Sequence, residues 1–234
     1  MTQSASERPQ TDGGQTVPLR GARGMIADKM VASLQQAAQL THHARADASA
    51  LLAAKAALAA DGARVSVEDL LMAALVRVLK RHPDINGTVR DREVVLSERV
   101  DLCVAIALPG NLLAAPAIFD AGALSLVDLR AKRQDLAERA RTNKLTVKEM
   151  TGGTFTISNL GLTRVEYFTP ILNTPQIGIL GVGRIIDSAV PTADGVAFKQ
   201  FVGLSLTFDH RAIDGAPAAE FLTDLCTEIE GFSP

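Results

Sequence analysis

Tryptophan is absent from this sequence of 234 residues, and Tyr167 is its only tyrosine. Proteins that stack the bases of single-stranded nucleic acids use several aromatic side chains, and binding to the phosphate backbone requires an excess of basic residues. The formal net charge here is −2, and both signs are spread along the chain. A nucleic-acid partner is therefore not expected.

Long apolar runs are missing as well. Charged residues, glycine or proline interrupt every run before it reaches the roughly 20 residues of a membrane-spanning helix, so no membrane partner is predicted. Residues 1–17 contain no apolar block of the kind that a secretory signal carries. These features favour a cytoplasmic protein.

Cysteine and histidine are scarce. Cys103 and Cys226 each lie inside an apolar run without a C-x-x-C motif, which favours reduced core residues over a disulfide framework. The four histidines have no cysteine or carboxylate partners at the spacing of metal ligands. No metal cofactor is expected.

Apolar periodicity predicts both helices and strands. Helices are expected over 20–39, 51–60, 67–81, 126–141 and 216–229, with Ser66 and Ser125 opening two of them. Strands are expected over 88–89, 93–96, 100–108, 154–157, 178–182 and 204–208, a turn at 109–111 leads into 112–118, and 42–47 is interpreted as an extended connection. The order of elements indicates an α+β fold, a mixed β-sheet flanked by helices in two layers. Residues 1–16 are predicted to be a flexible tail or the stub of a linker.

One histidine stands at a junction of predicted elements. His210 follows an alternating run that ends at Phe208, and Asp214-Gly215 then signals a turn before the last helix. A histidine held by rigid elements on both sides suits a general base near neutral pH. Taken alone, a structural histidine in a turn is the better explanation. Asp214, at i+4, is a second acid–base candidate.

A second candidate lies in Gly152–Gly161, a β-rich run with glycine at both ends. Ser158 and Asn159 leave the predicted strand, where serine and asparagine are ordinary turn residues. Alternatively, the Ser158 hydroxyl donates a hydrogen bond to developing negative charge, as in an oxyanion hole. Composition alone does not place Ser158 near His210.

Five segments together resemble the catalytic domain of the dihydrolipoamide acyltransferases, the E2 components of 2-oxoacid dehydrogenase complexes. They are Pro18–Ala27, Lys144–Met150, Gly152–Gly161 (GGTFTISNLG), Phe168–Gln176 (FTPILNTPQ) with the apolar run after it, and Ser205–Gly215 (SLTFDHRAIDG). The resemblance covers residues 17–230 in the family's order. It is far more specific than H-x-x-x-D-G alone, which chloramphenicol acetyltransferases share, and it implies their two-layer fold.

The resemblance implies a reaction and roles for three residues. His210 would deprotonate the thiol of coenzyme A or of dihydrolipoamide, and the thiolate would attack the acyl thioester of the other substrate. Ser158 would hydrogen-bond the resulting oxyanion, and Asp214 would be mainly an orienting carboxylate, since some family members carry asparagine there. Coenzyme A is then a substrate, and neither a metal nor an acyl-enzyme is needed. Arg184 is considered as a contact for a phosphate of coenzyme A, although a solvated charge is the simpler interpretation.

The chain also departs from the family's pattern. Residues 17–234 match only the catalytic domain, without a lipoyl domain, a peripheral-subunit-binding domain or the C-terminal hydrophobic hook of the cage-forming members. The expectation is a homotrimer with its active site between subunits, served by a separate lipoyl carrier and by other subunits of a 2-oxoacid dehydrogenase complex. Asp28-Lys29 resembles the Asp-Lys of a lipoyl attachment site, but its helical pattern argues against that role. His42-His43 is expected on a surface connection.

Two alternatives stay open. One is a chloramphenicol acetyltransferase-like enzyme that uses coenzyme A with an alcohol or amine acceptor. The other is a non-catalytic trimeric scaffold, which would have no need of His210 or Ser158. The acyl group, whether acetyl, succinyl or branched-chain, is not decided by the sequence.

Overall fold

The computed structural model describes residues 16–234, so the predicted tail, apart from Thr16, lies outside the described residues. A six-stranded sheet has the order β1-β10-β9-β8-β4-β7. These strands are β1 (Gln39–Asp47), β4 (Leu102–Val104), β7 (Ala117–Ile118), β8 (Phe155–Asn159), β9 (Gly178–Thr192) and β10 (Gly195–Asp209). Because β8 pairs parallel with β4 and β9 while the other pairs are antiparallel, the sheet is mixed, as predicted.

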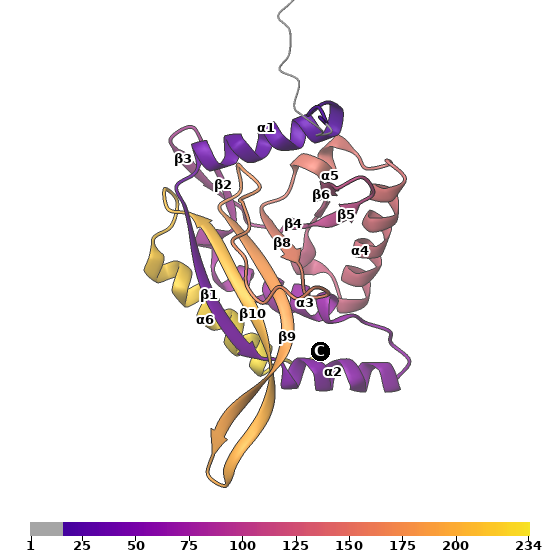
Figure 1. The fold of residues 1–234 in the computed structure, drawn as a ribbon, viewed down its shortest axis with the longest axis vertical. Coiled ribbons are helices and arrows are strands. Elements are labelled where there is room, and N and C mark those ends of the chain that lie inside the picture. The colour runs from indigo at the N-terminus through magenta and orange to yellow at the C-terminus, as the bar shows by residue number, and fades with distance from the viewer. Residues whose placement is uncertain (1–15) are drawn as a thin grey trace, which may run out of the picture.

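Helices α3 (Val67–Arg81) and α6 (Gly215–Glu230) cover one face of the sheet, behind it in the view of Figure 1. Helix α2 (Ser49–Ala60) lies at the lower end of the body and α4 (Leu126–Arg141) at its right-hand side. The buried faces of α3 and α6 contribute Leu75 and Phe221 to the core, where they join the inward side chains of β8, β9 and β10 such as Phe155. Two layers around one core make an α+β fold, which confirms the predicted class.

The opposite face of the sheet is crossed by the connection 160–177. Glycines on the strands leave room for it: a Cβ at Gly183 would lie 1.9 Å from the carbonyl oxygen of Glu166, and one at Gly181 would meet the ring of Phe168 at 2.8 Å. Helix α1 (Gly21–Gln36) lies across one end of the sheet, and α5 (Val147–Thr151) precedes β8 (Figure 1). This second face therefore carries the space in which a ligand could lie.

Two expectations about strands were wrong. The segment 42–47 is not a connection but part of β1, an edge strand in register with β10. His42 stacks on Phe208, and the more exposed His43 has its Nδ1 2.9 Å from Ser205 Oγ. The predicted strand 100–108 divides at Ala105 into β4 and β5 (Ile106–Leu108). The two halves pair with different strands: β4 belongs to the main sheet, whereas β5 pairs with β6 (Leu112–Ala114) in a separate hairpin. The alternation of apolar residues does not reveal which strand a segment pairs with.

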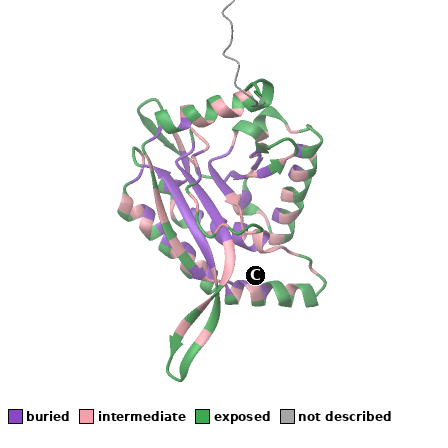
Figure 2. Ribbon diagram, in the orientation of Figure 1, coloured by how far each residue is buried: buried purple, intermediate pink, exposed green. Residues whose placement is uncertain are grey.

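The remaining strands either agree with the predictions or are longer than predicted. The hairpin β2 (Gly87–Arg90) and β3 (Glu93–Leu96) was expected. Strands β9 and β10, in contrast, are much longer than the predicted 178–182 and 204–208, and their distal halves project beyond the body as an exposed hairpin (Figures 1 and 2). Its polar residues hid this extension from the apolar pattern. Within residues 16–234, no helix is long and apolar enough to cross a membrane.

Candidate active site

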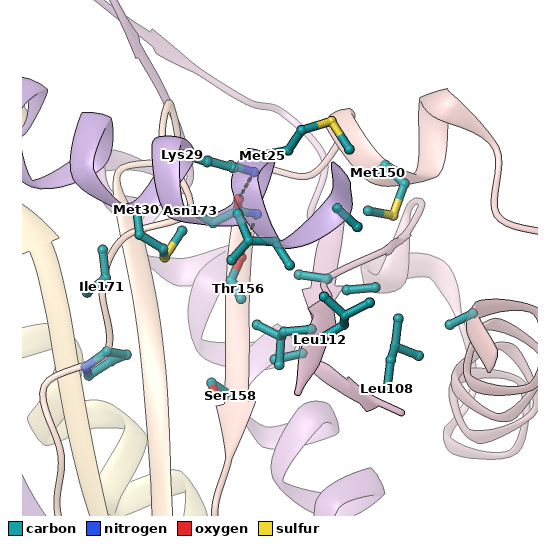
Figure 3. Close-up of a pocket in the computed structure, with 18 of the residues that line it drawn as sticks. Met25, Lys29, Met30, Leu108, Leu112, Met150, Thr156, Ser158, Ile171 and Asn173 are labelled. Carbon is teal, nitrogen blue, oxygen red and sulfur yellow. Dashed lines mark hydrogen bonds between the residues drawn. The ribbon is translucent and has the colours of Figure 1, made fainter. Parts of the chain in front are cut away.

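A pocket of about 650 Å³ lies on the second face of the sheet, beneath α1. Its walls come from α1, the β5–β6 hairpin, the α4–α5 connection and the segment 168–173 (Figure 3). Most of the lining is apolar, with Met25, Met30, Leu112, Met150 and Ile171 among its side chains. Such a concave apolar pocket with a few polar groups is the usual form of a small-molecule site.

The pleat of β8 aims Ser158 into this pocket. Successive side chains of a strand point to opposite faces, so Phe155 and Ile157 enter the core while Thr156 and Ser158 line the pocket. The strand ends in a turn in which Asn159 Oδ1 accepts a hydrogen bond from the Gly161 N–H (2.8 Å). Asn159 thus forms the turn, and Ser158 lines the pocket, while its role as an oxyanion donor stays a prediction.

A charged cluster anchors the end of β8 to the helix layer. Arg133 of α4 contacts Asp69 (2.7 Å) and Glu68 (3.2 Å) at the start of α3. Burial raises the pKa of Glu68, whereas Arg133 and a hydrogen bond with Asn159 act in the opposite direction. Asn159, the residue after Ser158, thus lies next to this cluster.

His210 lies directly after β10, as the sequence predicted. Its backbone N–H donates to the Ala38 carbonyl (2.9 Å), and its Nδ1 lies 3.4 Å from Asp214 Oδ1. The histidine side chain is 44% exposed, so its ring is accessible from outside the chain. Asp214 thus stands beside the histidine, at a distance too long for a strong hydrogen bond.

The residues flanking His210, Asp209 and Arg211, form a local ion pair. The buried carboxylate of Asp209 accepts hydrogen bonds from the Arg211 guanidinium, one of 2.6 Å from Nη2, and a weaker one from the Ala38 N–H (3.3 Å). The ion pair raises the pKa of Arg211. Asp209 and Arg211 therefore hold the turn in which His210 lies.

One chain does not bring Ser158 and His210 together. Ser158 of β8 pairs with Gly181 of β9, and Gly181 pairs with Ser205 of β10. His210 lies five residues beyond Ser205, and β10 is two strands away from β8. At about 3.3 Å per residue and 4.8 Å per strand, the two residues are on the order of 20 Å apart. His210 is also not among the residues that line the pocket.

Arg184 is not part of the pocket either. It lies on β9 where two residues, Gly183 and Arg184, oppose the single residue Gly203 of β10, and its N–H donates to the Val165 carbonyl (2.8 Å). This position gives no support to a contact with coenzyme A. Within residues 16–234, no three histidine, cysteine, aspartate or glutamate side chains converge as metal ligands would.

The sequence interpretation missed Lys29 as a site residue. Its helical placement is confirmed, but its ammonium enters the pocket and donates a hydrogen bond of 2.5 Å to Asn173 Oδ1 (Figure 3). Burial lowers its pKa, while Cys103 acts in the opposite direction. The available signal was its place on one helix face with Met25, Ile26 and Met30, where a solvated lysine would not be expected.

Comparisons with known proteins agree with this fold. The sequence model of the family described as 2-oxoacid dehydrogenases acyltransferase (catalytic domain) matches residues 11–233. The dihydrolipoyllysine-residue acetyltransferase component of the acetoin cleaving system of Bacillus subtilis is 38% identical over 221 residues, which cover 92% of this chain and 55% of the relative. The corresponding pyruvate dehydrogenase component of Corynebacterium glutamicum is 36% identical, covering 93% and 34%. The chain thus spans about half or less of these relatives.

Solved structures give the same result. A probable dihydrolipoamide acetyltransferase from Listeria monocytogenes superposes with a TM-score of 0.88 at 29% identity, covering 95% of this chain and 97% of that one. Dihydrolipoamide acetyltransferase from Azotobacter vinelandii, studied for the roles of a serine, a histidine and an asparagine in its catalytic mechanism, has a TM-score of 0.86 at 30% identity, with 97% of each chain covered. A chloramphenicol acetyltransferase, at 0.55 and 16% identity over 88% and 93%, shares the fold alone.

Proposed function

Since this chain belongs to the family of 2-oxoacid dehydrogenase acyltransferase catalytic domains, we propose that it moves an acyl group between dihydrolipoamide and coenzyme A. Two observations on one sheet carry the proposal. The Ser158 hydroxyl lies in an apolar pocket, and the exposed His210 lies beside the Asp214 carboxylate just after β10. In this proposal the lipoyl group arrives on a domain other than the catalytic one, because Lys29, whose Asp-Lys pair resembles a lipoyl attachment site, lies in α1 with its ammonium in the pocket.

In the proposed reaction, His210 takes the proton from the attacking thiol. A free thiol has a pKa of about 8.5 and histidine one of about 6.5, so a positioned imidazole can assist at neutral pH. The thiolate attacks the thioester carbonyl, Ser158 donates to the oxyanion, and collapse of the intermediate expels the second thiolate, which takes the proton back from His210. Asp214 stabilises and orients the imidazolium. Atoms balance without an acyl-enzyme.

The separation of Ser158 and His210 within one chain supports a site built from two chains. A second copy that places its exposed His210 at the mouth of the Ser158 pocket completes the constellation, and a cyclic arrangement repeats that heterologous contact at every interface. We infer the homotrimer as the assembly that does this, within a 2-oxoacid dehydrogenase complex. One related structure is the cubic core of the pyruvate dehydrogenase multienzyme complex, which covers 97% of this chain.

The Azotobacter relative supports the residue roles. Its histidine follows its serine, and its asparagine follows its histidine, at the same intervals at which His210 follows Ser158 and Asp214 follows His210 here. The third residue differs, since this chain has a carboxylate. An aspartate and an asparagine can both orient an imidazole, which is consistent with a supporting role for Asp214.

The test is acyl transfer from acetyl-CoA to free dihydrolipoamide. His210→Ala is expected to lower kcat by about 10²–10⁴-fold, and Ser158→Ala by about 10²–10³-fold. Co-assembly of the two inactive variants sharpens the result. If each site takes its histidine and its serine from different chains, random mixed assemblies regain about a quarter of the wild-type activity. A site within one chain regains none.

The outcomes separate the alternatives. No transfer by the wild type to dihydrolipoamide, but transfer to an alcohol or amine acceptor, identifies a chloramphenicol acetyltransferase-like enzyme. No transfer to any acceptor, with an intact trimer, identifies a scaffold. A monomer in light scattering that is fully active contradicts the shared site.

A further inference from the structure

We propose that Lys29 is a positioning residue for acyl transfer: it holds α1 over the pocket and, through Asn173, fixes the strand that carries Ser158. This inference rests on the proposed function and adds a residue to its site. Lys29 is the only charged residue that lines the pocket within residues 16–234. Lys29 is exposed as a residue, yet its ammonium points into the pocket and bonds Asn173 there, so its role calls for an explanation.

Helix α1 is attached to the body mainly by polar contacts. Ser33 is its only buried residue, and the Ser33 hydroxyl donates to the Leu172 carbonyl (2.7 Å). Lys29 binds the next residue, Asn173, and Arg23 Nη1 donates to the Asn111 carbonyl (3.0 Å). The helix nevertheless supplies one wall of the pocket through Met25, Ile26 and Met30. Its polar contacts therefore decide how that wall sits over Ser158.

The contact of Lys29 continues as a chain of hydrogen bonds into the sheet. Asn173 Nδ2 donates to Thr156 Oγ1 (3.4 Å), Thr156 Oγ1 donates to Gln176 Oε1 (2.5 Å), and Gln176 Nε2 donates to Cys103 Sγ (3.3 Å). With the Lys29 ammonium as first donor, all four bonds run in one direction. Bonds aligned in this way polarise one another in a low dielectric, and a cation at the head is the strongest donor the chain offers.

Although Lys29 is an exposed residue, its ammonium lies in the pocket and is bound by Asn173. Partial burial lowers the pKa of Lys29, and burial raises the pKa of the Cys103 thiol at the other end of the chain. Asn173 offers Lys29 a carbonyl oxygen, and Gln176 offers the thiol a donor. The segment 173–176 is therefore hydrogen-bonded to α1 through Asn173 and to β4 through Gln176, along the edge of the pocket.

Thr156 is the link to the reaction. It lies two residues before Ser158 on the same face of β8, about 7 Å away along the strand (Figure 3). A displacement of about 1 Å at a reacting centre can cost about 10²-fold in rate. Because Ser158 acts on the oxyanion and not on the ground state, its misplacement should lower kcat rather than raise KM.

The experiment compares Lys29→Met, which keeps the length of the side chain without a donor, with Lys29→Arg, which keeps a cationic donor. Lys55→Met, on the exposed side of α2, is the matched control. With acetyl-CoA and dihydrolipoamide, and with the folded fraction measured by circular dichroism, Lys29→Met should lower kcat about 10- to 100-fold. Lys29→Arg should stay within about threefold of wild type, with KM for coenzyme A little changed in all.

A double-mutant cycle with Asn173→Ala tests the route. If Lys29 acts through Asn173, the double variant is no slower than the slower single variant, whereas independent effects multiply. Three results would each overturn the inference. They are effects on kcat that multiply in the double variant, a kcat of Lys29→Met within twofold of wild type, and equal losses of kcat in Lys29→Met and Lys29→Arg. An active wild type with an unaffected Lys29→Met leaves the proposed function standing, whereas an inactive wild type overturns both.

Discussion

The two faces of the sheet are held together by different forces. On the helix face, α3 and α6 bury an apolar stripe against the strands, and nine residues of α3 and five of α6 are buried. On the pocket face, α1 buries only Ser33 and α5 buries none of its residues. Stability thus resides in one layer, while the pocket is enclosed by elements that hydrogen bonds and ion pairs keep in place.

The largest effect on stability should come from the helix face. Phe221→Ala removes a fully buried ring that packs on Phe155 and His82, and it should lower the free energy of unfolding by about 3–5 kcal/mol. Met25→Ala, on the pocket face, removes a side chain that is 68% exposed and should change the free energy of unfolding by about 0.5 kcal/mol or less. Urea denaturation of both variants measures the contrast, and similar losses would contradict it.

An intermediate effect is expected where α1 meets the segment 172–173. Ser33→Ala removes the buried donor to the Leu172 carbonyl and an acceptor of the Gln39 side-chain amide. Leaving buried partners unsatisfied should cost about 1–3 kcal/mol of unfolding free energy. Hydrogen exchange of the α1 amides should quicken more than exchange in α6. Ser188→Ala, on the projecting hairpin, is the control, and an equal loss in both variants would show that α1 is held in some other way.

The smallest effect depends on pH and concerns α5. Glu149 accepts two hydrogen bonds from the Arg139 guanidinium (2.6 and 2.9 Å). They are the main reason why its pKa is lowered from 4.5 to about 2, and hydrogen bonds from Thr146 add to the effect. A carboxyl group with a lowered pKa stabilises the fold above its ordinary pKa, and this contribution is lost as the pH falls from about 5 towards 2. Glu149→Gln should remove that part of the pH dependence.

For a pair this close to the surface, the loss of unfolding free energy near neutrality should be about 1 kcal/mol or less. Thermal unfolding at several pH values measures it. In an Arg139→Met background the Glu149→Gln substitution should change the slope against pH less, because only the hydrogen bonds from Thr146 then lower the pKa of Glu149. An undiminished change of slope in that background would mean that Arg139 is not the main cause of the shift.

The contrast between the faces also explains what the sequence could predict. Helix α3 was predicted to within a residue because Ser66 and Asp69 form a capping box and its apolar residues recur at helical spacing. Strand β1 was missed because its polar residues find partners across the sheet: Thr41 bonds Thr207, and His43 lies beside Ser205. Such pairings depend on register, which local composition does not encode.

The candidate site was predictable in part for the same reason. Motif order placed Ser158 at the end of a strand and His210 at the end of another, and both positions are found. The sequence could not show that about 20 Å separates them in one chain, since that distance follows from the strand order. Lys29 was overlooked because a lysine in a helix is ordinarily solvated; only its three apolar neighbours on the same face suggested otherwise.

Helix α1 lies near both candidate residues of the site. Its middle forms a wall of the Ser158 pocket. Ala38, two residues beyond its end, donates its N–H to Asp209 Oδ1 and accepts a hydrogen bond from the His210 N–H at its carbonyl group. If the sites form between chains, as proposed, helix α1 contributes to two of them. It lines the pocket of Ser158 in one site, and through Ala38 it supports the turn that carries His210 to the other.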